Sequence, residues 1–170
     1  MALVAAALGV AVVVIVLPGL APPALTPAGE PLVVLDPATV HQIDVVPRDG
    51  SSYSFRRENG AWFLVRGEER LEVPSDRLDG FVKSAATLTR LVVMSEPEMN
   101  LAEFGLDPPR ARVTLRGGNE VTLALGDRNP PLTALYVQVL PKANIVLVGA
   151  VLLWEFDKLV VLSKAQPVEP

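Results

Sequence analysis

Cysteine is missing from this chain of 170 residues, and histidine occurs once, at position 41. Without cysteine the chain can form no disulfide, no thiolate nucleophile, no lipid anchor on a cysteine and no sulfur-ligated metal site. Basic residues are also scarce, since 15 Lys and Arg against 19 Asp and Glu give a net charge of −4. A chain with this charge has no basic field that attracts phosphates, so we expect no nucleic-acid partner.

Charge is absent altogether from the N-terminal stretch, where Glu30 is the first charged side chain. As a helix, residues 2–17 would measure about 24 Å, which nearly spans a hydrocarbon core of about 30 Å. Prolines from Pro22 onward end this helix. No lysine or arginine precedes the apolar run, as one would in a cleaved signal peptide. We therefore predict a single transmembrane helix at residues 1–21, with a signal peptide and a buried core helix as the alternatives.

The side of the membrane is predicted from the charges that flank this helix. The positive-inside rule counts lysine and arginine near the ends of a span, and the first of these is Arg48. Only the α-amino group precedes the span, whereas Glu30, Asp36 and Asp44 follow it. We expect a single-pass membrane protein whose soluble domain is periplasmic or otherwise extracytoplasmic.

Proline content divides the remainder of the chain into three parts. Residues 22–35 are Pro-rich and predict an extended linker that holds the next domain away from the bilayer. Residues 36–163 alternate between strand patterns and helix patterns and form one extramembrane domain. Residues 164–170 form a Pro-containing tail.

The extramembrane domain begins with a predicted strand meander. Asp49-Gly50 and Asn59-Gly60 are strong hairpin-turn pairs, and each is flanked by short runs of alternating apolar residues. A helix with one buried face is predicted to begin at Ser75, which can cap its first turn.

The second half of the domain repeats this order. Alternating strands around residues 111–125 and 135–149 precede an amphipathic helix at residues 152–162. We therefore predict an α+β fold in which the transmembrane helix is followed by an antiparallel sheet with two covering helices. Strands followed by a helix, twice over, suggest a weak pseudo-repeat of a β-meander plus a helix.

The stretch FGLDPP at residues 104–109 is the most distinctive in the chain. Together with the strands at residues 113–115, 125–126 and 136–137, it resembles an uncharacterised bacterial "domain of unknown function" family. The resemblance covers residues 36–162 and includes the Trp-Phe-Leu strand at residues 62–64. It implies a membrane-anchored envelope protein found beside auxiliary subunits of gliding-motility-type ABC transporters. It implies no catalytic residues, because none is assigned in the family.

Candidate metal-binding residues gather around the single histidine. His41 lies in a predicted strand with no nucleophile motif beside it. A metal held by His41 with Asp36 or Asp44 would need at least three converging ligands. We interpret His41 as a surface or strand-edge histidine.

Acidic residues and glycines give no clearer indication of chemistry. Glu96, Glu98 and Glu103 cluster around the central loop, and we interpret them as solvated charges rather than an acid–base pair. Gly117-Gly118 predicts a turn, and no phosphate-binding glycine motif occurs. We predict that the protein is not an enzyme and that it has no catalytic residue, no cofactor and no metal.

Two hypotheses for function follow. In the first, the protein is a non-catalytic, membrane-anchored accessory or scaffold subunit that stabilises a larger membrane complex, such as a transporter or a respiratory or photosynthetic assembly. It contacts the bilayer through residues 2–20. The candidate contacts with other subunits are Arg56, Arg57, Trp154 and Phe156. Solvation of the arginines and core packing of the two aromatic residues are the alternative interpretations.

The second hypothesis is an envelope binding module. It would capture a glycan, a peptide or a lipid in a groove between the sheet and the helices. Tyr53, Trp62 and Tyr136 would line that groove.

Overall fold

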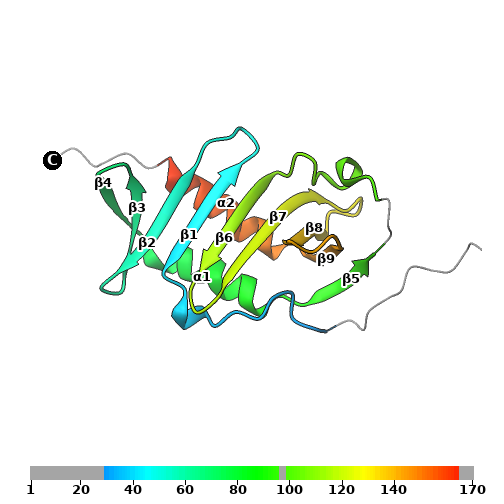
Figure 1. Cartoon of the computed structure of the whole chain (residues 1–170), viewed down its shortest axis with the longest axis horizontal. Coiled ribbons are helices and arrows are strands. Elements are labelled where there is room, and N and C mark those ends of the chain that lie inside the picture. Colours follow the sequence, from blue (N-terminus) through cyan, green and yellow to red (C-terminus); the bar gives the residue numbers. More distant parts are fainter. Residues whose placement is uncertain (1–28, 96–98, 165–170) are drawn as a thin grey trace, which may run out of the picture.

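The structure, a computed structural model, describes residues 29–95 and 99–164 (Figure 1). In chain order its main elements are β1 (Gln42–Pro47), β2 (Tyr53–Glu58), β3 (Ala61–Arg66), β4 (Glu69–Val73), α1 (Ser75–Thr87), β5 (Arg90–Met94), β6 (Ala111–Arg116), β7 (Glu120–Arg128), β8 (Ala134–Leu140), β9 (Ile145–Gly149) and α2 (Val151–Ser163). Short 3-10 helices precede β1 and β6, at Pro37–Thr39 and Leu101–Phe104.

This architecture corrects the predicted fold class. Within the described ranges the strands form one nine-stranded antiparallel sheet, in the order β4-β3-β2-β1-β6-β7-β8-β9-β5, accompanied by two α-helices. No helix in that part of the chain is long and apolar enough to cross a membrane. The predicted transmembrane helix, residues 1–21, lies outside the described residues. The prediction was wrong because local patterns do not show which strands become neighbours, so it missed β4, β5 and the order of the nine strands.

The sheet consists of two halves that meet at its centre. The first half contains β1 to β4 and is followed by α1, and the second contains β6 to β9 and is followed by α2. The two halves join where β1 pairs antiparallel with β6, from Gln42 opposite Arg116 to Pro47 opposite Ala111. β5 pairs with β9 and extends the second half to the far edge. In Figure 1 the first half lies on the left and the second on the right.

Both helices pack against the same face of the sheet, and the main hydrophobic core lies between them and the strands (Figure 1). Because side chains alternate across a strand, every second residue points into this core. The largest of these fully buried side chains from the strands are Ile43, Phe55, Trp62, Leu64, Leu115, Leu123, Leu125 and Leu135. The two helices also touch each other, at a point where Gly80 of α1 faces Glu155 of α2.

A second, smaller apolar cluster lies on the opposite face of the second half. Leu106, Ala124 and Ile145 form its buried centre. Its partly buried members are Met94, Met99, Leu101, Phe104 and Tyr136. The segment at residues 99–109, which contains the FGLDPP stretch, therefore covers the outer face of the second half; we name it the outer cover.

Two glycines allow the outer cover to lie this close to the sheet. Gly105 ends the 3-10 helix in the left-handed region, with φ of 65°. A Cβ atom on Gly126 of β7 would lie 2.3 Å from the carbonyl oxygen of Phe104, so only glycine fits there. Arg48, from the β1–β2 connection, donates hydrogen bonds to the carbonyl oxygens of Gly105 and Pro109, at 3.3 and 3.4 Å. The outer cover is thus held from both halves of the sheet.

The part of the predicted linker that the structure describes, residues 29–35, packs against the domain. Leu32 and Val33 are buried in the main core. The amide of Leu32 donates to the carbonyl of Leu88 at 2.7 Å, and the amide of Arg90 donates to the carbonyl of Glu30 at 2.8 Å. The packed unit therefore begins before the predicted domain boundary at residue 36.

Candidate interaction surface

Helix α2 supplies the largest exposed aromatic side chain among the described residues. Its sequence, VLLWEFDKLVVLS, is apolar on more than one face. Leu152, Leu153, Phe156 and Leu159 are buried against the sheet and α1. Val160 and Leu162 are partly buried against the same core, so the remaining apolar residues of α2 face solvent or a partner.

Three of these remaining apolar side chains fall on one line along the helix. Val151 is 45% exposed, Trp154 is 68% exposed and Val161 is 71% exposed. With Lys158 they occupy positions i, i+3, i+7 and i+10, which place them on one stripe about 15 Å long. We name this stripe, Val151, Trp154, Lys158 and Val161, the α2 ridge.

Charged neighbours fix the geometry of the α2 ridge. The Nζ atom of Lys158 lies 5.8 Å from the centre of the Trp154 indole ring, within range of a cation–π interaction. The same Nζ atom donates to Glu155 at 2.7 Å. Glu155 is itself largely buried against Gly80 of α1. Lys158 is thus restrained from both sides, which lowers the entropy cost of ordering this surface in a complex.

A shallow hollow of about 230 Å³ adjoins the C-terminal end of the α2 ridge. Pro74 and Arg77 from the start of α1 line one side of it, and Lys158, Val161 and Leu162 line the other. An apolar ridge beside a hollow with a basic rim is a shape that a protein surface can match.

The structure does not bring the four predicted contact residues together. Trp154 lies on the α2 ridge, whereas Phe156 is 3% exposed and packs in the main core. Arg56 is exposed on the sheet face opposite the helices, because it follows Phe55, which points into the main core. Arg57 points to the helix face, where it hydrogen-bonds Asp79 and lies 4.9 Å from the Trp62 ring.

The residues considered for metal binding are spread over separate contacts. His41 places Nδ1 3.3 Å from the carbonyl oxygen of Thr39. The Asp36 carboxylate accepts from the amide of Ala38 at 3.0 Å, at the start of the first 3-10 helix. Asp44 accepts from Ser54 at 2.8 Å and is paired with Arg116. Within residues 29–95 and 99–164, no three His, Cys, Asp or Glu side chains are grouped to hold a metal ion.

The acidic group predicted around the central loop is described only in part. Glu103 lies in the 3-10 helix Leu101–Phe104 and accepts from Asn100 at 3.1 Å. Glu96 and Glu98 lie outside the described residues.

The aromatic groove expected for a binding module does not form from the three residues assigned to it. Trp62 is buried in the main core, and its Nε1 donates to Asp79 at 2.9 Å. Tyr53 packs against the same core. Tyr136 points to the opposite face, where its ring meets Phe104 edge-on at 5.0 Å. These three side chains therefore share no cleft.

Sequence reasoning identified Trp154 but missed Val151, Lys158 and Val161 as its neighbours on the surface. Their spacing was visible in the sequence, since positions 151, 154, 158 and 161 form one helical stripe. The direction in which that stripe points was not visible, because the opposite side of α2 is equally apolar.

Residues 62–158 match the model of a protein family whose description is "Domain of unknown function (DUF4340)". The chain belongs to this family. The predicted resemblance to a domain-of-unknown-function family is thereby confirmed. The match runs from β3 to α2 and includes the outer cover, Gly126 and part of the α2 ridge. No curated protein and no solved structure matches the chain.

Proposed function

We propose that this DUF4340-family chain is a non-catalytic accessory subunit that binds another protein of a larger membrane complex through the α2 ridge. The observation that carries the proposal is the exposure of Trp154 between Val151 and Val161. Tryptophan dominates the binding energy of many protein interfaces, particularly where smaller apolar residues surround it. An exposed apolar stripe of this kind on an otherwise ordinary surface is typical of an interaction site.

The contrast with α1 supports the proposal. The exposed positions of α1 carry Asp76, Arg77, Asp79, Lys83 and Thr87, which are polar. Both helices cover the same face of one sheet, so burial in the core does not explain why only α2 has apolar residues on its outer side. A partner protein on α2 explains the difference.

The class of host complex rests on the resemblance in sequence. We propose a transporter, and specifically one with auxiliary subunits of the gliding-motility type, because the FGLDPP stretch resembles proteins found beside such subunits. We also propose that the domain is extracytoplasmic and that residues 2–20 contact the bilayer. The uncharged composition of residues 2–20 supports contact with the bilayer. The α-amino group before this segment and Glu30, Asp36 and Asp44 after it support the extracytoplasmic side.

A non-catalytic role is supported by the environment of the polar groups. His41 contacts a backbone carbonyl, and the carboxylates of Asp36 and Asp44 are engaged in a helix cap and an ion pair. These groups serve local structure.

The test is the size of the complex that contains the full chain after extraction in mild detergent. We expect a stoichiometric complex with a different protein, measured by size-exclusion chromatography with light scattering and mass spectrometry. Trp154→Ala should weaken the complex about 30-fold or more, because truncation of an interface tryptophan typically costs about 2 kcal/mol or more. The thermal midpoint of the chain should hardly change, since this side chain lies outside the core.

Val34→Ala is the matched control, because Val34 is also apolar and exposed but lies outside α2. It should leave the complex intact. A full chain that runs alone, a complex made only of copies of this chain, or a Trp154→Ala variant that assembles as well as the control would each contradict the proposal.

A further inference from the structure

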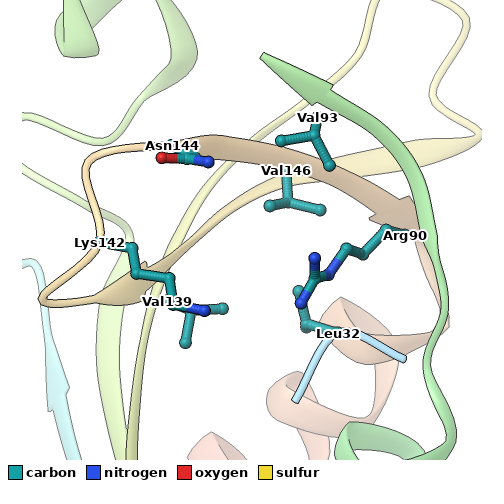
Figure 2. A pocket seen from close by; sticks show the side chains of 7 residues that line it. All are labelled: Leu32, Arg90, Val93, Val139, Lys142, Asn144 and Val146. Atoms are coloured by element: carbon teal, nitrogen blue, oxygen red, sulfur yellow. The ribbon is translucent and has the colours of Figure 1, made fainter. Parts of the chain in front are cut away.

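We infer that a small pocket between the β8–β9 hairpin and β5 is a binding site for a short aliphatic carboxylate. Arg90, at the start of β5, and Lys142, in the β8–β9 turn, lie on opposite sides of this pocket. Figure 2 shows that both side chains turn toward the space between them. The inference is independent of the proposed function, because none of these residues belongs to the α2 ridge.

The charges around the pocket are not balanced within the described part of the chain. Arg90 has a partner in Glu30, whose carboxylate lies 3.3 Å from Nη1 and is mostly exposed to solvent. No carboxylate in residues 29–95 or 99–164 forms an ion pair with Lys142. Two cationic side chains that face one pocket favour an anion between them.

Arg90 offers donors to an anion in the pocket through the outer nitrogens of its guanidinium. Only Nη1 of these has a carboxylate partner among the described residues, the mostly exposed Glu30. A carboxylate has two oxygens that accept hydrogen bonds from the fork of an arginine side chain, so it could engage Arg90 and Lys142 together.

The floor of the pocket selects for an aliphatic chain. Leu32, Val93, Val139 and Val146 line it with apolar carbon, and Asn144 adds a neutral polar group at the side of the β8–β9 turn (Figure 2). Its volume is about 50 Å³. Since one water molecule needs about 10–15 Å³ of such space, the pocket holds roughly four atoms the size of water. This volume holds a carboxylate group and its first carbon, and a longer aliphatic chain extends out of the pocket.

Such a carboxylate has two sources, a free short-chain acid and the C-terminal residue of a polypeptide. The test begins with butyrate as the probe and the full chain in mild detergent at constant ionic strength. We expect butyrate to bind saturably in calorimetry and to raise the thermal midpoint, as ligands that bind only the folded state do. Butylamine and butanol, which lack the carboxylate, should do neither.

Charge-neutralising variants assign the site. Arg90→Gln and Lys142→Gln should each weaken butyrate binding about tenfold, because each removes one charge-assisted hydrogen bond. Lys83→Gln is the matched control, since it removes the same charge from an exposed position of α1. Glu30→Gln should tighten binding about threefold, because it removes the carboxylate that competes for Arg90. A gain of affinity cannot arise from damage to the fold.

Two further peptides separate the sources. A tripeptide that ends in valine with a free carboxylate, bound more tightly than butyrate and lost on C-terminal amidation, would identify a polypeptide end. Equal or tighter binding of butyrate would identify a free acid. Absence of saturable butyrate and tripeptide binding in the wild-type chain, or unchanged affinity in both Arg90→Gln and Lys142→Gln, would overturn the inference.

Discussion

The two halves of the sheet differ most on the face turned away from the helices. In the second half the outer cover buries Leu106 against Ala124 and Ile145. In the first half the corresponding face carries charged side chains, including Arg56 and Arg70, and no described segment covers it. The same strand architecture thus supports an apolar outer face in one half and a polar one in the other.

The difference explains what the most distinctive stretch of the sequence does in the fold. The FGLDPP residues form the outer cover, with Leu106 inserted toward the sheet and Gly105 at the turn. The neighbouring strand β7 supplies Gly126, which leaves room for the backbone of Phe104. These residues therefore specify packing, and their presence in a sequence predicts this covered half rather than a catalytic site.

The largest effect on the difference between the two halves is expected from a substitution that displaces the outer cover from the sheet. Gly126→Ala places a Cβ atom where it would meet the Phe104 carbonyl oxygen at 2.3 Å. We expect a loss of about 3 kcal/mol in the free energy of unfolding, because backbone must shift to relieve the overlap. The measurement is urea unfolding of the full chain in mild detergent.

Gly149→Ala is the control for this prediction. Gly149 also lies in a strand of the second half, but the atom nearest to its added Cβ, on the Leu88 side chain, would be 4.0 Å away, which is an ordinary van der Waals distance. It should change the free energy of unfolding by less than about 0.5 kcal/mol. A Gly126→Ala variant as stable as this control would show that the outer cover does not lie tightly on β7.

A second prediction compares the outer faces of the two halves directly. Leu106→Ala, under the outer cover, should lower the free energy of unfolding by about 2 kcal/mol, through lost burial and a residual cavity. Val65→Ala, on the outer face of β3, should lower it by less than about 1 kcal/mol, since Val65 is only half-buried. Equal losses in the same urea experiment would mean that both faces are covered in solution.

The smallest expected effect concerns the β1–β2 turn of the first half. The hydroxyl of Ser51, and then its amide, hold the pKa of Asp49 below its ordinary value of 3.8 by donating hydrogen bonds to the carboxylate. A carboxylate whose pKa is lowered in the folded state stabilises the protein at pH values above its unfolded-state pKa. This stabilisation is lost as the pH falls through the folded-state pKa. Ser51→Ala should therefore raise the pKa of Asp49 part of the way to 3.8.

Carbon-13 NMR titration of the Asp49 carboxyl group measures this shift, and Ser52→Ala, an exposed neighbour, serves as its control. The amides of the outer cover should not respond to either substitution, because the Asp49–Ser51 contact is local. A coupled response of Gly105 or Leu106 would show that the turn and the outer cover act as one unit, through Arg48.

Local features of this fold could be predicted from the sequence, and long-range ones could not. Asn59-Gly60 joins β2 to β3, as turn chemistry indicates, and α1 begins at Ser75 as predicted. The predicted capping by Ser75 was wrong, because Pro74 is the N-cap residue and the Ser75 hydroxyl accepts from the amide of Trp62 at 3.2 Å. The pairing of β1 with β6 cannot be predicted from the sequence pattern of either strand. β4 was missed because Glu69, Arg70 and Glu72 interrupt its apolar alternation.

The candidate surface shows the same limit within one helix. Trp154 and Phe156 are two positions apart, and both belong to an apolar helix sequence. Only the orientation of α2 against the sheet decides that Phe156 enters the core while Trp154 faces outward. The phase of a helix can be predicted when one side is polar, as in α1, and not when both sides are apolar.

The charged composition of β4 has a consequence for how molecules associate. A fibre that grows by adding sheet to sheet requires two receptive borders on every molecule, and here one border presents Glu69, Arg70 and Glu72. Pairing of strands between copies through the β4 border is therefore disfavoured. Growth of an open-ended fibre, which needs pairing at both borders, is disfavoured for the same reason.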